Sequence, residues 1–250
     1  MNYFIVDSVK GGCGKSTIAL WKAINLKLQG QEKSKVCYVD LDILGTSMEK
    51  FIGCRIEPNT VIYLNALFAG ERNAVKKKKV TTSLNFKVEN IGEKNAFILD
   101  ESEDAVKISA IFCSPKQEDK NLFRPNYLTG GQCIDYTFFA LRMKELFEEL
   151  KDGGYTDIVI DMPPNSDPYT DSVFDLLLHR TSSSSPAKDW TVTLLLISSF
   201  DRPNIQANVN WFQKICNKDH DWYPFDKVEC YFNDVRGCFS KSDITLGTEM

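Results

Sequence analysis

The fold of this chain of 250 residues is decided near its N-terminus by Ser8–Thr17, which reads S-V-K-G-G-C-G-K-S-T. A short apolar run, Tyr3–Asp7, precedes this stretch, and a segment of helical period, Ser16–Leu28, follows it. The order of strand, glycine-rich turn and helix is the structural context of a phosphate-binding loop. The stretch therefore predicts a site for a phosphorylated ligand, and it carries two lysines, Lys10 and Lys15.

The glycines of this loop explain how it would bind phosphate. A common pattern, G-x-x-x-x-G-K-[ST], is matched at its end by Gly14-Lys15-Ser16, but Val9 stands where its first glycine should fall. Glycines let the backbone curl closely around an anion, which the N–H groups and the helix N-terminus then bind. We expect Lys15 to reach the β and γ phosphates of ATP, and the Ser16 hydroxyl to bind Mg²⁺. The loop residues expected to contact the nucleotide are Gly11, Gly12, Cys13, Gly14, Lys15, Ser16 and Thr17.

Two further segments place carboxylates at the ends of apolar strands. Val36–Val39 runs into Asp40-Leu41-Asp42, and Asp157–Ile160 runs into Asp161, which two prolines follow after Met162. In an open α/β sheet, ligands collect beyond the carboxyl ends of the strands, and residues i and i+2 share a face. Both carboxylates of the first segment can therefore point toward one site. Asp161 suits a Mg²⁺ ligand held through water, because Mg²⁺ loses its waters reluctantly.

The form K-G-G-C-G-K-S-T resembles the deviant Walker A motif of the ParA/MinD family of P-loop ATPases, written K-G-G-x-x-K-[ST]. The resemblance implies that Lys10 crosses a dimer interface to the phosphates of the ATP bound by a partner subunit. It also implies that Asp42 orients the attacking water with Asp40 near the metal, and that Asp161-Met162-Pro163-Pro164 is a Walker B segment. In related proteins an asparagine placed like Asn233 hydrogen-bonds the adenine. The expected catalytic residues are thus Lys10, Lys15 and Asp42, and the expected metal ligands are Ser16, Asp40 and Asp161.

The rest of the chain agrees with this fold class. Apolar runs of strand length alternate with longer segments of helical period, which predicts a mainly parallel, doubly wound α/β sheet with helices on both faces. The runs D-I-V-I-D and T-V-T-L-L-L-I-S are continuously apolar, as buried parallel strands are. We expect one domain over residues 1–250, with a hairpin insertion at 80–100 and a surface loop at 180–190.

Composition and charge indicate which partners, DNA or membrane, and which cellular compartment to expect for this chain. The net charge of −4 argues against coating DNA through bulk charge, but the basic cluster Lys76–Lys79 leaves non-specific DNA binding open. No apolar run approaches the roughly 18–20 residues that span a membrane, and the N-terminus lacks the form of a signal peptide. The eight cysteines include no C-x-x-C pair and are expected to be reduced structural thiols. A cytoplasmic protein without a membrane partner is therefore expected.

The function favoured by these features is that of a Mg²⁺- and ATP-dependent dimerising ATPase, which hydrolyses ATP to ADP and phosphate. Such a protein would act as a nucleotide switch in partitioning or positioning, for example of plasmids or chromosomes, with a protein activator or cargo. Two alternatives stay open. The segment after Asp42 looks like that of Mrp-type iron–sulfur carriers, although their C-x-x-C pair is missing. A small-molecule kinase or synthetase on the same fold is the other, and it would need a pocket for a second substrate.

Overall fold

The computed structural model describes most of the chain. The described residues are 1–30, 34–45, 48–52, 63–69, 81–91, 94–100, 102, 104–116, 120, 123, 135–164, 168–178, 189–215 and 225–233. The basic cluster Lys76–Lys79 and most of the surface loop expected at 180–190 lie outside them.

The described strands form one sheet of eight, in the order β4-β3-β5-β2-β6-β1-β7-β8. The pairs β1·β6, β1·β7, β2·β5, β2·β6 and β7·β8 are parallel, and β3 runs antiparallel to both β4 and β5. The strands are β1 (Asn2–Asp7), β2 (Val36–Asp40), β3 (Thr82–Ile91), β4 (Lys94–Leu99), β5 (Val106–Ile111), β6 (Asp157–Asp161), β7 (Thr191–Ser199) and β8 (Lys227–Asn233). The prediction of a mainly parallel α/β sheet is confirmed.

The central strands are buried on both faces, which explains their uninterrupted apolar sequences. Every residue of β2 and β6 is buried. Alternate side chains of β2 enter opposite cores, with Cys37 and Val39 on one face and Val36 and Tyr38 on the other. The sheet is therefore the middle layer of three.

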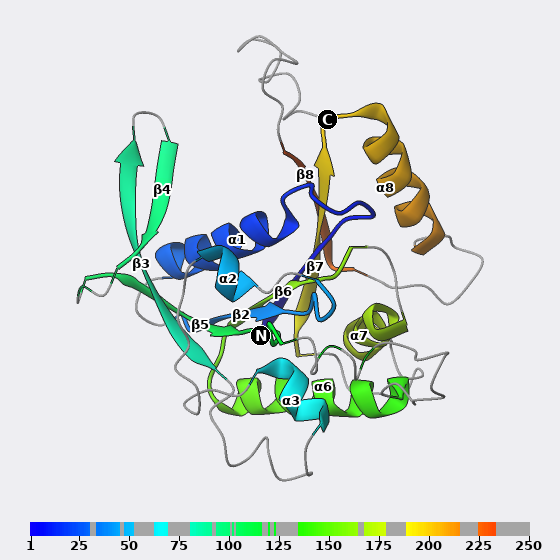
Figure 1. Ribbon diagram of the computed structural model, residues 1–250, viewed down its shortest axis with the longest axis horizontal. Helices are drawn as coiled ribbons and strands as arrows, with labels where there is room; N and C mark the ends of the chain where they lie inside the picture. The colour runs from blue at the N-terminus through cyan, green and yellow to red at the C-terminus, as the bar shows by residue number, and fades with distance from the viewer. Residues whose placement is uncertain are drawn as a thin grey trace.

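Helices cover both faces of the sheet (Figure 1). The helices are α1 (Lys15–Gln29), α2 (Met48–Ile52), α3 (Leu64–Ala69), α6 (Tyr136–Asp152), α7 (Pro168–Leu178) and α8 (Arg202–Ile215). Side chains of α1 and α2 pack in one core, and those of α3, α6, α7 and α8 pack against the other. Figure 1 shows α1 on one side of the sheet, and α3 with α6 on the opposite side. No described helix is long and apolar enough to cross a membrane.

The predicted boundaries are close to the observed ones at the nucleotide loop. The first helix starts at Lys15, one residue before its predicted start, and ends at Gln29. The N–H of Gly30, the residue that caps it, donates to the carbonyl of Leu26 at 2.9 Å. The predicted hairpin at 80–100 contains β3 and β4, which pair antiparallel at the edge of the described sheet. A single domain over residues 1–250 stays a prediction.

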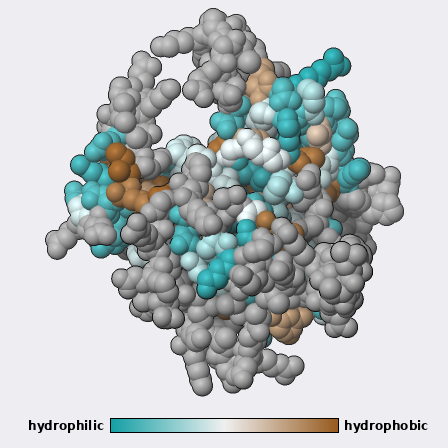
Figure 2. Space-filling model, viewed as in Figure 1, coloured by the Kyte–Doolittle hydropathy of each residue, from teal (hydrophilic) through white to brown (hydrophobic). Residues whose placement is uncertain are grey.

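Exposed apolar side chains are scattered over the described surface. On the face in Figure 2, coloured residues alternate between teal and brown, and a small brown group lies toward the β3–β4 end of the sheet. Ile98 and Leu99 of β4 are among the exposed large hydrophobic residues. Single exposed hydrophobic residues are normal in folded proteins, so this pattern by itself marks no partner.

Candidate functional site

The loop between β1 and α1 borders an open cavity of about 370 Å³. The cavity is lined by Gly11, Gly12, Gly14, Lys15, Ser16, Thr17, Asp42, Met48 and Pro164. Gly12 and Gly14 have positive φ angles of 79° and 91°, which β-branched or bulky residues rarely adopt. Lys15 starts the helix and is only 7% exposed. The cavity therefore combines glycine backbone, a helix N-terminus and the lysine side chain of Lys15, which together favour an anion such as phosphate.

Two features favour glycine at position 14: its positive φ angle and the close side chain of Asn233. A Cβ added there would lie 2.2 Å from Nδ2 of Asn233, whereas one at Gly154, which also has a positive φ of 77°, would meet nothing within 4 Å. We expect Gly154→Ala to destabilise the protein by about 1–2 kcal/mol, the usual cost of a left-handed conformation. Gly14→Ala should cost more, and it should also weaken ATP binding about tenfold because the loop must shift.

Thermal unfolding and calorimetric titration of both variants measure the two effects. Equal losses of stability, with ATP affinity kept in Gly14→Ala, would contradict a close contact between Gly14 and Asn233.

The carboxyl ends of β2 and β6 bring Asp40 and Asp161 together beneath the loop, and each is 1% exposed. Burial, followed by the charge of Asp161, raises the pKa of Asp40 to about 7. Burial also raises the pKa of Asp161 to about 6, against the opposing effects of the nearby Ser16 hydroxyl, Tyr38 and Lys15. Two buried carboxyl groups with raised pKa values form a site that a cation would stabilise.

The two carboxyl groups differ in their hydrogen bonds. Asp40 accepts from the backbone N–H groups of Asp42 at 3.0 Å and Met48 at 3.2 Å, so it shapes the loop that follows β2. Asp161 Oδ2 accepts from the Tyr38 hydroxyl at 2.9 Å. Its Oδ1 is buried and has no hydrogen-bond partner within the described part of the chain. Asp161 therefore retains an acceptor for a water molecule or an ion, and the predicted metal contact of Asp40 stays a prediction.

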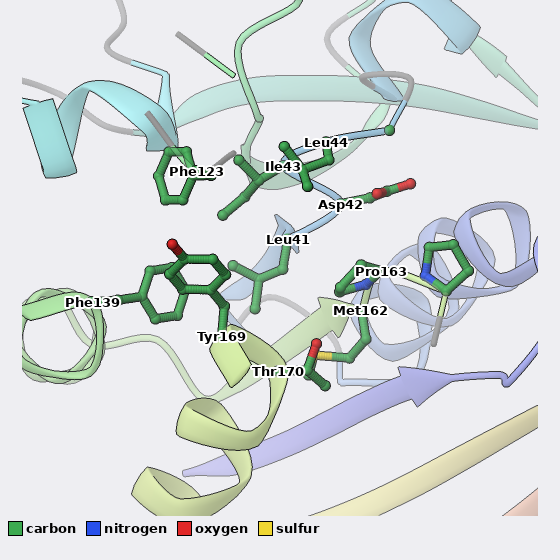
Figure 3. A pocket seen from close by; sticks show the side chains of 12 residues that line it. Leu41, Asp42, Ile43, Leu44, Phe123, Phe139, Met162, Pro163, Tyr169 and Thr170 are labelled. Atoms are coloured by element: carbon green, nitrogen blue, oxygen red, sulfur yellow. The ribbon is translucent and has the colours of Figure 1, made fainter. Parts of the chain in front are cut away.

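Asp42 lies between two cavities. It lines the cavity of the glycine loop and also a second pocket of about 270 Å³, and Pro164 is shared in the same way. Figure 3 shows the rings of Phe123, Phe139 and Tyr169 on one side of the second pocket, while the carboxylate of Asp42 points away from them. A Cβ at Gly45 would lie 2.0 Å from Oδ2 of Asp42, so the glycine leaves room for this side chain.

Lys10 lies at the rim of the loop and is exposed, unlike Lys15. Its backbone N–H donates to the Ser8 hydroxyl at 3.3 Å, and that hydroxyl donates to the Lys10 carbonyl at 3.2 Å. Hydrogen bonds from Ser199 and Asn204 hold the pKa of Asp201 below its usual range, and Lys10 adds a smaller electrostatic contribution. Lys10 is therefore an exposed residue of the loop, and it is not among the residues that line the cavity.

Cys13 and Asn233, both predicted to contact the nucleotide, do not line the phosphate cavity as the loop glycines do. The Cys13 side chain is buried in the core that packs against α1, so only its backbone belongs to the loop surface. Asn233 ends β8, and its side-chain amide donates to the Cys13 carbonyl at 2.9 Å. This bond joins the last described strand to the glycine loop, and the adenine contact of Asn233 stays a prediction. Among the described residues, Cys13, Cys37, Cys113 and Cys230 are free thiols.

Sequence reasoning missed three residues that shape this site. Tyr38 bonds to Asp161, Gly45 makes room for Asp42, and Asn208 on α8 accepts from the backbone N–H of Val9 at 3.1 Å. Tyr38 alternates with Asp40 along β2, which places both on one face, and this signal was present in the sequence. Nothing in the sequence pattern indicates that Asn208 reaches a residue 199 positions away.

The arrangement has the strand, glycine loop and helix of a phosphate-binding P-loop, and comparisons with known proteins find P-loop proteins of similar fold. Residues 1–98 match a ParA family model described as "NUBPL iron-transfer P-loop NTPase". The ParA protein of pNOB8 superposes with a TM-score of 0.58 at 12% identity, covering 99% of this chain and 69% of that chain. MinD of Aquifex aeolicus gives 0.53 at 14% identity, covering 99% and 73%, and apo McdA of Cyanthece gives 0.52 at 16%, covering 91% and 70%. No curated protein matches the chain.

These findings confirm the resemblance stated from the motifs: residues 1–98 match the ParA family model, and the fold is similar to the folds of pNOB8 ParA and MinD. The family model covers the glycine loop and the Asp40–Asp42 segment, and the structural likeness extends over the remaining strands. At these low identities the superposed structures establish the fold. Activity, partners and the roles of individual residues require a separate argument.

Proposed function

We propose that this protein is a Mg²⁺-dependent ATPase whose ATP-bound form is a homodimer. The observation that carries the proposal is the cavity beside the glycine loop, where Lys15, Ser16 and Asp42 surround the place expected for the terminal phosphates. A triphosphate bound there would meet backbone N–H groups, the N-terminus of α1 and the Lys15 ammonium group. Asp42, on the opposite wall, would orient a water molecule for in-line attack on the γ-phosphate.

The described residues fit a magnesium ion at this site. Ser16 lines the cavity, and the orphaned Oδ1 of Asp161 could accept from a metal-bound water molecule. No group of three or more His, Cys, Asp or Glu side chains forms a metal cage in the part of the chain that the structure describes. Mg²⁺ usually takes few protein ligands and keeps several waters, which fits a direct contact from Ser16 and a water-mediated contact from Asp161. When bound, the ion would neutralise charge on the phosphates during transfer.

The exposed position of Lys10 supports its proposed role in a dimer. A lysine that serves its own active site is better placed inside the cavity, as Lys15 is, whereas Lys10 faces outward from the rim. Across an interface its ammonium group would offset the charge of a second triphosphate. ATP would then favour association, and hydrolysis would weaken it. This cycle is the proposed switch.

The cellular role that we propose is partitioning or positioning of a cargo, with a protein activator. The structures with a similar fold include a plasmid partition protein and a cell division protein. A structure of pNOB8 ParA bound to nonspecific DNA has a TM-score of 0.52 at 14% identity and covers 87% of this chain and 60% of that chain. Non-specific DNA binding by this chain stays open, because Lys76–Lys79 lie outside the described residues.

Asp42→Asn is expected to slow ATP hydrolysis about 100-fold while leaving ATP affinity within about twofold, since it removes a general base that acts mainly in the transition state. Phosphate release under saturating ATP measures the rate, and titration with a non-hydrolysable analogue measures the affinity. The matched control is Asp104→Asn, which changes an exposed carboxylate that does not line either cavity. Unchanged hydrolysis in Asp42→Asn would remove this residue from the proposed reaction.

A second candidate function is phosphoryl transfer to a small molecule, and the second pocket favours it. The pocket adjoins the phosphate cavity through Asp42 and Pro164, and its walls are mostly apolar or aromatic. A small acceptor held there would lie beside the γ-phosphate. Mass spectrometry of products after ATP turnover with cell metabolites distinguishes the two functions. Inorganic phosphate as the sole phosphorylated product other than ADP supports the switch, and a phosphorylated metabolite supports transfer.

The iron–sulfur alternative comes from the segment after Asp42, and the description of the matched family model is in line with it. A shared cluster needs thiolate ligands that lie close together. Among the described cysteines, three are buried and Cys230 is exposed on β8, and no three of them lie together within the described residues. Cys238, eight positions beyond Cys230, lies outside the described residues. Anaerobic reconstitution with iron and sulfide, followed by visible absorption, tests this alternative directly.

A further inference from the structure

The glycine loop is joined to α8 by a buried asparagine that the proposed reaction does not use. Asn208 is 3% exposed. Its Oδ1 accepts from the backbone N–H of Val9 at 3.1 Å, and its Nδ2 donates to the carbonyl of Ile197 on β7 at 3.0 Å. Val9 directly precedes Lys10, so this side chain fixes the backbone next to the exposed lysine.

The turn that carries Lys10 is held at its other end as well. The Cys13 carbonyl accepts from Asn233 of β8 at 2.9 Å. Between these two anchors, Lys10, Gly11 and Gly12 are all exposed. Both anchors come from the same edge of the sheet, formed by β7, α8 and β8, and β7 pairs with β8 along its length. The turn is therefore held by hydrogen bonds both before and after Lys10, through Val9 and through Cys13.

Hydrogen bonds hold the first turn of α8 against the end of β7, and this fixes the position of the helix that carries Asn208. Asp201 caps the helix by accepting from the backbone N–H of Asn204 at 2.9 Å and from the Ser199 hydroxyl at 2.6 Å. The Ile205 N–H donates to the Asp201 carbonyl at 3.0 Å. Farther along the helix, Trp211, Phe212 and Ile215 pack against the core. Asn208 lies between the cap and this apolar face.

We propose that Asn208 is a positioning residue for Lys10, which holds the lysine's backbone where the side chain can reach the nucleotide of a partner subunit. This inference rests on the proposed function, because it assigns a purpose to the orientation of Lys10 in the dimer. A long, exposed lysine has many rotamers, so its reach depends on a fixed backbone. Asn208 supplies that constraint from a helix which is 199 residues distant in the sequence.

Three variants of the full-length chain separate this role from general packing. Asn208→Ala removes both hydrogen bonds. Asn208→Asp keeps an acceptor for the Val9 N–H and loses the donor to Ile197. Asn210→Ala is the matched control, because Asn210 lies on the same helix and is exposed, with a side-chain bond only to Gln206 in the described structure.

Hydrogen exchange of the nucleotide-free protein tests the geometry without any assumption about function. The Val9 amide, followed in peptides that cover residues 8–13, should exchange about tenfold faster in Asn208→Ala, because the partly buried hydrogen bond that protects it is lost. Protection should return in Asn208→Asp and be unchanged in Asn210→Ala. Equal loss of protection in the alanine and aspartate variants would overturn the proposal, because the bond to Ile197 would then account for the effect.

The affinity of ATP-dependent dimerisation then tests whether Asn208 positions Lys10 for the nucleotide of a partner subunit. Asn208→Ala should weaken dimerisation about tenfold and change ATP affinity less than about twofold. Asn208→Asp, which keeps the acceptor for the Val9 N–H, should dimerise as the wild type does, and Asn210→Ala should be unchanged as well. Equal weakening in Asn208→Ala and Asn208→Asp would overturn the proposal. A wild-type protein that stays monomeric with ATP would refute the proposed function, and the exchange experiment would still decide whether Asn208 holds the loop.

Discussion

Lys15→Ala is expected to lower the affinity for ATP about 100-fold or more, which corresponds to the loss of charge-assisted hydrogen bonds worth about 1.5–3 kcal/mol each. The Lys15 side chain starts α1 inside the cavity and is 7% exposed, so its ammonium group would be partly desolvated beside the phosphates. Electrostatic attraction is stronger in such a place than at the surface. Isothermal titration with ATP and Mg²⁺ measures the change.

The control for this variant is Lys144→Ala, which removes an exposed lysine of α6. It should bind ATP with unchanged affinity. Thermal unfolding of the nucleotide-free proteins shows whether Lys15→Ala is folded, and we expect it to be, because Lys15 lines an open cavity and alanine is a strong helix former. Retained ATP affinity in a folded Lys15→Ala protein would contradict the assignment of the phosphate cavity.

Lys10→Ala is expected to slow ATP hydrolysis about 100-fold or more, the usual effect of removing one group that stabilises charge in the transition state. ATP affinity should stay within about threefold, because Lys10 lies outside the phosphate cavity of its own subunit. The contrast between the two lysines is the informative result. Loss of Lys15 weakens binding, whereas loss of Lys10 leaves binding and slows the reaction.

The concentration dependence of the rate separates a partner's lysine from one that acts in its own subunit. Hydrolysis per wild-type chain should rise with protein concentration until the dimer is saturated, since the active site is completed by association. Lys10→Ala should lack this dependence, while Lys144→Ala should keep it. A wild-type rate per chain that is independent of concentration, together with full activity of Lys10→Ala, would exclude an intersubunit role.

Much of the fold was predictable because its central strands are buried on both faces. The continuous apolar runs of β2, β6 and β7 predicted that these segments are strands, with bounds close to the observed ones. The glycine loop predicted that a strand precedes it and a helix follows it. The order of strands in the sheet was less accessible. It depends on which strands pair across long sequence separations, such as β1 with β6 and β7, and these contacts leave no local pattern.

The candidate site was predictable where chemistry restricts the residue type. Lys15, Ser16 and Asp42 line one cavity, and Asp40 and Asp161 end neighbouring strands, as the motifs indicated. The hydrogen bonds of Asp40 to the loop after β2 were not predicted, because an aspartate that binds backbone N–H groups and one that binds a metal look alike in sequence. Asn208 was missed because buried asparagines acquire their partners only through tertiary packing.

Sedimentation velocity tests the central claim most directly, namely that two copies of this chain associate around two ATP molecules. The wild-type protein and Lys10→Ala are compared with a non-hydrolysable ATP analogue and with ADP, each with Mg²⁺. We expect the wild type to sediment at twice its chain mass of 28.4 kDa with the analogue and as a monomer with ADP, and Lys10→Ala to be monomeric in both. A wild-type mass that does not change between the two nucleotides, although both are bound, would contradict the account.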